Sequence, residues 1–266
     1  IIFSIVSILL VCSSNYVLNE ILDRNYDKHH PEKKHRPMVR GRFTLRFAYL
    51  TYFSFSLFSF LFAYVVNFNF LIVIFLLFIM GLIYNVKPIR AKDIPYIDVV
   101  SESFNNVLRF FLGWFIIDHN YLPPISIIII FWTSGAFLMT IKRFSEMKAN
   151  QKRSISKYRK TFLKYTPNKL LLISIFYCIL CNLLLGIFLI KYNVGLILLF
   201  PLIAIIFVHY LSLSLEDNPI TQHPEKIFFD KTLIWYIIAS SILLIIILIY
   251  PFSFLDFLKN TKLIII

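Results

Sequence analysis

Residues 19–37 read Asn19-Glu-Ile-Leu-Asp23-Arg-Asn-Tyr-Asp27-Lys-His-His30-Pro-Glu-Lys33-Lys-His-Arg36-Pro37, and they connect an apolar segment to a dense basic loop. Asn19, Asp23 and Asp27 are each four residues apart, a spacing that advances by only about 40° per step on an α-helix. The three side chains are therefore predicted to form one polar ridge. Two carboxylates beside several Lys and Arg residues indicate a place where a divalent cation and a phosphorylated ligand can meet.

The remainder of the chain is strongly apolar. Of its 266 residues 59% are hydrophobic, and the mean hydropathy is +0.76. Apolar segments of roughly 17 to 26 residues recur, each long enough to cross a hydrocarbon core. We place eight of them at residues 1–22, 44–66, 70–86, 96–117, 123–143, 167–191, 194–215 and 232–251. This pattern predicts an all-α polytopic membrane bundle that forms a single domain over residues 1–266.

The formal net charge of +13 follows the membrane topology rather than indicating a nucleic-acid partner. Lys and Arg are concentrated in alternate connectors, at residues 24–46, 85–95, 142–169 and 216–231. The positive-inside rule places these connectors in the cytoplasm and the short turns and C-terminal tail on the other side. The long loops are cytoplasmic in this arrangement, so we expect the functional site there.

Ionisable residues within spanning segments are costly and point to function. Asp98, Glu102, Asn105 or Asn106, and Arg109 fall near one face of the fourth segment. This stripe is predicted to line a cavity that binds a polar or phosphorylated ligand. The alternative is an ion pair within the helix between Glu102 and Arg109.

Two further groups of polar residues lie where segments end. Lys142, Arg143 and Glu146 open the most basic loop, although basic residues at a helix C-terminus are also ordinary membrane anchors. Tyr84 and Lys87 end the third segment and are placed to reach a phosphate, although a tyrosine alone is common at a membrane interface.

Several of these motifs resemble the UbiA-type intramembrane prenyltransferase superfamily. Asn19-Glu-x-x-Asp23-x-x-x-Asp27 is similar to its first Asp-rich motif, with Glu20 in place of the usual Asp. Asp27-Lys-His-His30-Pro31-Glu-Lys33-Lys-His-Arg36-Pro37 resembles the corresponding stretch of the decaprenyl-phosphate phosphoribosyltransferase branch, with Lys28 replacing Arg. The run from Lys142 to Glu146 resembles that branch's Lys-Arg-Tyr-Ala-Glu and stands where aromatic-substrate enzymes carry a second Asp-rich motif.

The resemblance implies nine spanning helices. Eight are seen here, and the chain begins inside an apolar segment without Met, so we expect the first helix to be missing. It also implies a Mg²⁺ ion held by Asn19, Asp23 and Asp27. The expected catalytic residues are Asp23, Asp27, Glu102 and Glu146, and the expected substrate-binding residues are Lys33, Arg36, Tyr84, Lys87, Arg109, Lys142 and Arg143.

The implied activity is displacement of diphosphate by a membrane-embedded transferase with a polyprenyl lipid substrate and a phosphorylated or diphosphate co-substrate. The branch resemblance favours phosphoribosyl transfer from phosphoribosyl diphosphate to a polyprenyl phosphate. The alternative within the family is prenyl transfer from a polyprenyl diphosphate to an aromatic or other small acceptor. A polytopic transporter is the alternative of another class, but inverted repeats and broken helices at the midplane are not seen in the sequence.

Overall fold

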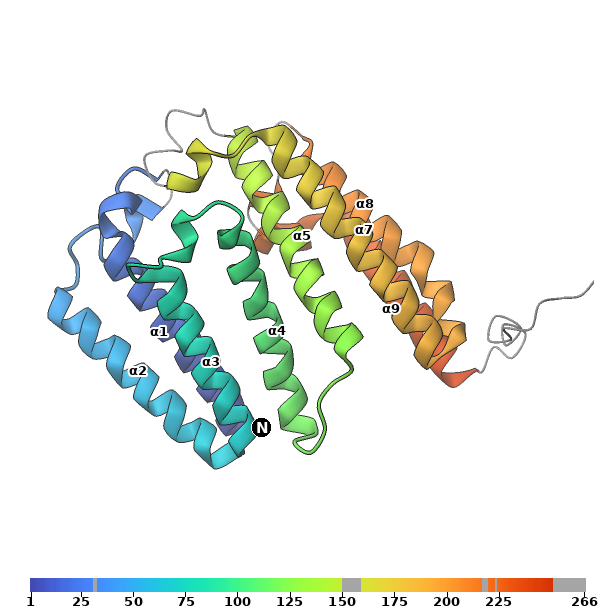
Figure 1. The fold of residues 1–266 in the computed structure, drawn as a ribbon, viewed down its shortest axis with the longest axis horizontal. Helices are drawn as coiled ribbons and strands as arrows, with labels where there is room; N and C mark the ends of the chain where they lie inside the picture. The colour runs from blue at the N-terminus through green and yellow to red at the C-terminus, as the bar shows by residue number, and fades with distance from the viewer. Residues whose placement is uncertain (31–32, 150–158, 217–219, 223, 251–266) are drawn as a thin grey trace, which may run out of the picture. The chain divides into compact units, whose positions relative to one another are not determined.

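The computed structural model describes residues 1–30, 33–149, 159–216, 220–222 and 224–250, and these residues form helices without any strand (Figure 1). The long helices of this described part are α1 (Ile2–Asp27), α2 (Leu45–Val66), α3 (Phe68–Asn85), α4 (Ile97–Ile117), α5 (Ile125–Ala149), α7 (Pro167–Tyr192), α8 (Phe200–Ser214) and α9 (Lys231–Ile249). The predicted all-α bundle is confirmed. Each of the eight apolar segments corresponds to one long helix.

Short 3-10 helices lie in the connectors, except for η4, which begins the seventh apolar segment directly before α8. Their bounds are η1 (Lys33–His35), η2 (Ala91–Asp93), η3 (Lys160–Leu163), η4 (Val194–Leu199), η5 (Ile220–Gln222) and η6 (Pro224–Phe229). Pro31 and Glu32 of the basic loop, the centre of the connector 142–169 and the tail after residue 250 lie outside the described residues. The predictions that concern those residues, including the side of the membrane on which the tail lies, remain predictions.

Seven helical stretches within the described residues are long and apolar enough to cross a membrane, one fewer than the eight predicted. The exception is α4. Its apolar residues are interrupted by Asp98, Glu102 and Arg109 and by two asparagines, which lower its hydropathy. Charged side chains in such a helix need partners in the protein because lipid offers none.

The chain divides into two compact units, Ile1–Pro124 with Asn150–Pro167, and Ile125–Ala149 with Asn168–Ile266. The first unit contains α1 to α4 with η1 to η3, and the second contains α5 and α7 to α9 with η4 to η6. The expectation of a single domain over residues 1–266 stays a prediction.

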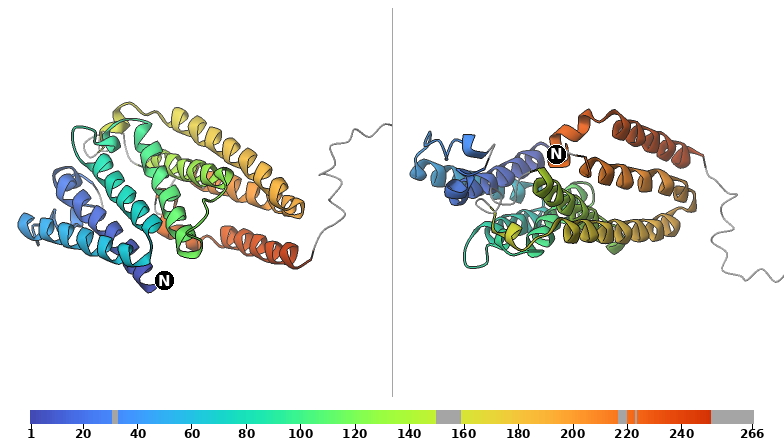
Figure 2. Two further views of the ribbon diagram at one scale, coloured as in Figure 1. Left: turned by 60° about the horizontal axis from the view of Figure 1, so that its bottom comes forward. Right: turned by 90° about the horizontal axis from the view of Figure 1, so that it is seen from above.

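The first unit is built on the packing of α1 against α2 and α3, which can be followed in two further views (Figure 2). Val11 of α1, Phe70 and Ile74 of α3 and Leu112 of α4 are fully buried in its core. Small residues let α1 and α2 approach closely, as is usual between membrane helices. Ser7 donates a hydrogen bond of 2.8 Å to the carbonyl oxygen of Ser59 across this contact.

The second unit has its own core, in which Phe137 and Ile141 of α5 pack with Tyr210 of α8. Asp230 begins α9 by accepting a hydrogen bond from the Leu233 N–H, and it also pairs with His209 at 2.9 Å. Burial acts to raise the pKa of Asp230, but the hydrogen bonds from Leu233 and His209 outweigh it and hold that pKa below its usual value. This carboxylate therefore has a structural role as a helix cap.

We predict that Gly81→Ala weakens the contact between α3 and α1. The added methyl group would lie 2.0 Å from Asn15 Oδ1, and the Asn15 amide is held by a 3.2 Å hydrogen bond to the carbonyl oxygen of Leu77. Overpacking of this kind costs about 1–3 kcal/mol, so the midpoint of thermal unfolding in detergent should fall.

The matched control is Gly113→Ala, where an added Cβ meets no atom within 4 Å. It should leave the unfolding midpoint unchanged or raise it, because Ala favours a helix more than Gly does. Adding Asn15→Ala to Gly81→Ala should recover part of the loss. The steric explanation is wrong if the double variant is no more stable than Gly81→Ala.

Candidate functional site

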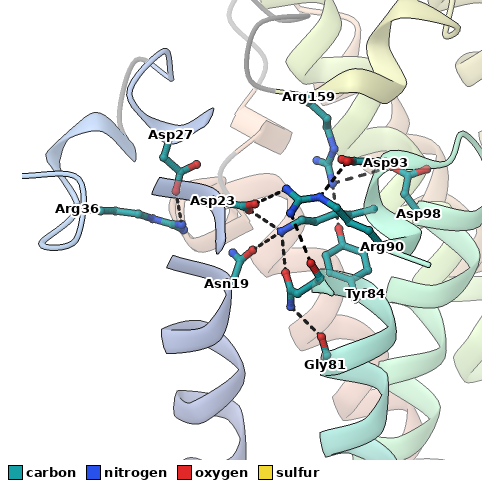
Figure 3. Close-up of polar contacts among 12 residues, drawn as sticks. Asn19, Asp23, Asp27, Arg36, Gly81, Tyr84, Arg90, Asp93, Asp98 and Arg159 are labelled. Atoms are coloured by element: carbon teal, nitrogen blue, oxygen red, sulfur yellow. Dashed lines mark hydrogen bonds and ion pairs between the residues drawn. The ribbon is translucent and has the colours of Figure 1, made fainter. Parts of the chain in front are cut away.

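The last turns of α1 and α3 and the short helix η2 bring opposite charges together in the first unit (Figure 3). The α1 helix continues to Asp27, five residues past the predicted end of its apolar segment, so the polar ridge is helical. Asp23 accepts a hydrogen bond of 2.7 Å from Arg90 and another of 2.6 Å from Lys92. These contacts join α1 to the segment that follows α3.

Lys92 is the centre of this arrangement. Its ammonium group lies 2.6 Å from Asp23 Oδ2, 2.8 Å from Asn19 Oδ1 and 2.7 Å from Asn85 Oδ1. Only 5% of the Lys92 surface is exposed. Burial lowers the pKa of Lys92 to about 8, although the Asp23 carboxylate acts in the opposite direction. Three oxygen atoms from two helices thus converge on one buried cation.

Arg90 stands on the other side of the same carboxylate. Its backbone is in the left-handed region with φ of 37°, which costs a non-glycine residue roughly 1–3 kcal/mol unless its surroundings impose it. Its guanidinium group donates to Asp23 and to Asp93 Oδ2 at 2.9 Å and lies 5.1 Å from the centre of the Tyr26 ring. These side-chain contacts maintain the strained conformation.

A second polar group joins α3, α4 and the segment around η3. The Tyr84 hydroxyl donates to Glu102 Oε2 at 2.9 Å and accepts a hydrogen bond of 2.9 Å from Arg159. Arg159 also lies 4.0 Å from Asp98, which is completely buried and accepts a 2.5 Å hydrogen bond from Tyr165. Asp98 therefore holds the segment 159–165 against the start of α4.

The two groups are neighbours. The Lys92 ammonium group lies 6.0 Å from the centre of the Tyr84 ring, within the range of a cation–π interaction. Three cationic side chains, from Arg90, Lys92 and Arg159, thus gather within one polar region of the first unit. Clustered cations of this kind suit a ligand with several negative charges.

The remaining carboxylate of the ridge has a partner of its own. Asp27 is buried and pairs with Arg36 at 2.8 Å, which turns the basic loop back towards α1. The structure thus brings Asn19 and Asp23 together at Lys92 and places Asp27 separately with Arg36. The Lys33 backbone N–H donates to His30 Nδ1 at 3.2 Å in the same loop.

Of the other predicted site residues, some contact one another in the first unit, some are exposed, and some lie in the second unit. Tyr84 and Glu102 meet, whereas Lys87 is exposed and Arg109 is exposed and donates to Asn106 at 3.0 Å. An ion pair between Glu102 and Arg109 within α4 is not present. Lys142, Arg143 and Glu146 belong to the second unit, where Arg143 pairs with Glu146 at 3.4 Å. Their meeting with Asp23 and Asp27 stays a prediction.

Four residues of the site were not singled out from the sequence, namely Asn85, Arg90, Lys92 and Arg159. Three of them lie in or beside the basic connector 85–95, from which only Lys87 was chosen. The signal available in the sequence was the charge of that connector. Which of its cations turns inward depends on the backbone path from Asn85 to Tyr96.

The donor atoms fit a hard cation such as Mg²⁺, which prefers carboxylate and amide oxygens. Within the described residues no group of three or more His, Cys, Asp or Glu side chains is placed to hold a metal ion. The oxygens at the site come instead from one carboxylate and two amides, and they already surround the positive charge of Lys92. In the structure these oxygens accommodate the ammonium group of Lys92.

The fold defines an integral membrane protein made of helices. Its helix ends and connectors carry a buried site of paired acidic and basic side chains. The chain matches the UbiA prenyltransferase family over residues 1–229 and belongs to that family. This confirms the superfamily indicated by the motifs.

Solved structures with the same fold come from Archaeoglobus fulgidus. A UbiA homolog bound to GPP and Mg²⁺ has a TM-score of 0.72 and 20% identity, over 91% of this chain and 84% of that one. The UbiA homolog bound to DMAPP and Mg²⁺ has a TM-score of 0.71, also with 20% identity over 91% and 84% of the two chains. At this level of identity the likeness shows the fold. Among curated proteins none matches the chain.

We predict that Asp23→Asn destabilises the protein more than Asp27→Asn does. The first change leaves Arg90 and Lys92 buried without their shared carboxylate, a loss of about 3 kcal/mol or more. In the second, the Arg36 side chain is 23% exposed and can be hydrated, so about 1 kcal/mol is expected. Unfolding midpoints in detergent measure both, and equal losses would contradict this account of the site.

Proposed function

We propose that this protein is a Mg²⁺-dependent membrane transferase that displaces diphosphate at the cytoplasmic mouth of its bundle. One observation carries the proposal. The side-chain oxygens of Asn19, Asp23 and Asn85 converge on the ammonium group of Lys92, and Arg90 and Arg159 lie nearby. The family match favours a transferase over a transporter. The charge of the connectors supports the cytoplasmic side.

In this proposal Asn19, Asp23 and Asp27 hold the metal. The similar structures were solved with Mg²⁺ and a prenyl diphosphate, GPP or DMAPP, which supports the same assignment for this chain. When bound, Mg²⁺ supplies neutralising charge for a diphosphate leaving group. Asn85 adds a further oxygen donor to the set suggested by the sequence.

Cationic side chains of the chain stabilise the departing diphosphate. Arg90, Lys92 and Arg159 are preorganised by their hydrogen bonds, so they need little rearrangement as negative charge develops. The Tyr84 hydroxyl, which donates to Glu102 and accepts from Arg159, would turn its O–H from Glu102 to a phosphate oxygen when diphosphate binds. Lys33 and Arg36 extend the positive charge into the basic loop.

Anion and cation binding at this site are coupled through Asp23. In the structure its two carboxylate oxygens are occupied by Arg90 and Lys92. A diphosphate competes for those same two cations, and the carboxylate that they leave then favours a metal ion. Such coupling is reciprocal, so each ligand raises the affinity for the other.

For the donor we propose phosphoribosyl diphosphate and for the acceptor a polyprenyl phosphate. The support lies in the basic motif from Asp27 to Pro37 and in Lys142, Arg143 and Glu146, which replace a second Asp-rich motif. We further assign the catalytic and substrate-binding roles of Glu102, Glu146, Lys87 and Arg109 to this reaction. The second candidate is prenyl transfer to a small acceptor, favoured by the prenyl diphosphates in the similar structures.

Labelled phosphoribosyl diphosphate and a polyprenyl phosphate should yield a lipid-linked ribose phosphate with the purified protein, and only when Mg²⁺ is present. Asp27→Asn should abolish the product, by at least about 100-fold, because a metal ligand is lost while the fold survives. Thin-layer separation of the labelled lipid measures the product. Full activity of Asp27→Asn would disprove the metal assignment.

The control variant is Asp118→Asn, at the other end of α4, where the side chain only accepts hydrogen bonds from the backbone of Asn120 and Tyr121. An amide oxygen preserves that role, so activity should be unchanged. Prenylation of an aromatic acid from a prenyl diphosphate, without any lipid-linked ribose phosphate, would select the second candidate.

A further inference from the structure

An apolar cavity of about 240 Å³ lies between α1, α2 and the loop that joins them. Its lining residues are Tyr16, Val17, Glu20, Pro37, Met38, Phe43, Phe47, Ala48 and Thr51. Apart from Glu20, the lining has no charged residue. The cavity lies at the ends of two candidate membrane spans, where their basic connector begins and ends. The basic connector at the ends of these spans predicts a position at the membrane–water interface.

The cavity lies on a different side of α1 from the polar site. Asn19 and Asp23 contact η2 through Lys92, whereas Glu20 is turned by about 100° from Asn19 around the helix. A polyprenyl substrate whose phosphate lies at Lys92 is therefore not placed to fill it. A different ligand is needed.

The wall formed by the loop is a defined structure. The ion pair between Arg36 and Asp27 fixes the loop to α1, and the two residues that follow Arg36 line the cavity. Within the loop the Arg40 N–H donates to the Arg36 carbonyl, and the Arg42 N–H donates to the Pro37 carbonyl, both at 3.0 Å. The cavity is thus maintained by contacts that involve no ligand.

Two aromatic residues of the cavity lining are partly exposed at the protein surface. Phe43 and Phe47 stack with their ring centres 5.3 Å apart and are each about half exposed. Each follows an exposed arginine, Arg42 or Arg46. Residues 33–46 hold six Lys and Arg and no carboxylate. Planar guanidinium groups pair well with phosphate oxygens, and Lys and Arg at this depth attract anionic lipid.

We propose that this cavity binds one acyl chain of an anionic phospholipid of the surrounding membrane, with the phosphate of the headgroup at Arg42 and Arg46. The apolar lining suits a hydrocarbon chain and excludes the headgroup. Glu20 disfavours an anion inside the cavity, so the phosphate belongs at the opening on the α2 side. The bound lipid covers the connector that positions Asp27.

Native mass spectrometry of the full chain tests this site after incubation with equal amounts of phosphatidylcholine and phosphatidylglycerol that have matched acyl chains. The wild-type protein should retain phosphatidylglycerol preferentially. Arg42→Gln/Arg46→Gln should lower its retention by about tenfold or more, since each arginine contributes to the attraction. The matched control Lys160→Gln/Lys164→Gln removes two exposed cations elsewhere in the first unit and should retain the lipid.

A second pair of variants tests the chain-binding part. Thr51→Phe fills the cavity, while Thr51→Val removes the same hydroxyl group, which donates to the Phe47 carbonyl, without filling it. Only Thr51→Phe should reduce phosphatidylglycerol retention, with the unfolding midpoint confirming that both variants fold.

The proposal is wrong if the wild type retains both lipids equally, if the lysine control loses as much as the arginine variant, or if Thr51→Phe still retains the lipid. Displacement of phosphatidylglycerol by an equimolar polyprenyl phosphate would instead assign the cavity to a substrate chain. Transferase activity is not the readout, so this result stands independently of the proposed function.

Discussion

A buried ammonium group within a membrane bundle must be surrounded by oxygen atoms, and this requirement organises the first unit. Lys92 meets it with one carboxylate and two amides, from Asp23, Asn19 and Asn85. Because these acceptor oxygens come from α1 and α3, the Lys92 ammonium group also fixes how the ends of those helices meet. Removing any one of these side chains leaves the others buried without a partner, which destabilises the protein because little water reaches them. The same contacts thus serve stability and prepare the site.

The sequence predicts the elements better than it predicts their contacts. Hydropathy locates the long helices of the described residues, and the spacing of Asn19, Asp23 and Asp27 predicts the ridge. The partners of that ridge depend on the chain after α3, where Arg90 and Tyr96 both have positive φ. Propensity disfavours such conformations for these residue types, so tertiary contacts impose them. The sequence therefore points to Lys87, whereas the structure places Lys92 at the site.

The α4 helix shows a related limit. Asp98 and Arg109 are eleven residues apart, so they share a face of the helix but are separated along it by about 16 Å. The periodicity therefore predicts correctly that both side chains lie on the same face of α4. It does not predict which of them is buried. Asp98 is buried because Tyr165 and Arg159 cover the start of α4, and Arg109 is exposed further along. One stripe of polar residues can thus include a buried residue at one end and an exposed residue at the other.

The network around Asp23 also bears on the choice between donors. Arg90 and Lys92 contact carboxylate and side-chain amide oxygens through their charged groups. These contacts contain nothing that distinguishes a ribose from an isoprenoid. Diphosphate binding is a property shared by both reactions, whereas the organic part of the donor must be recognised elsewhere. Lys142, Arg143 and Glu146 differ from an Asp-rich motif in both charge and hydrogen-bonding capacity. A second metal site of the Asp-rich kind needs two carboxylates, and this segment offers only Glu146. In the proposed function, these are therefore the residues at which phosphoribosyl and prenyl donors would be told apart.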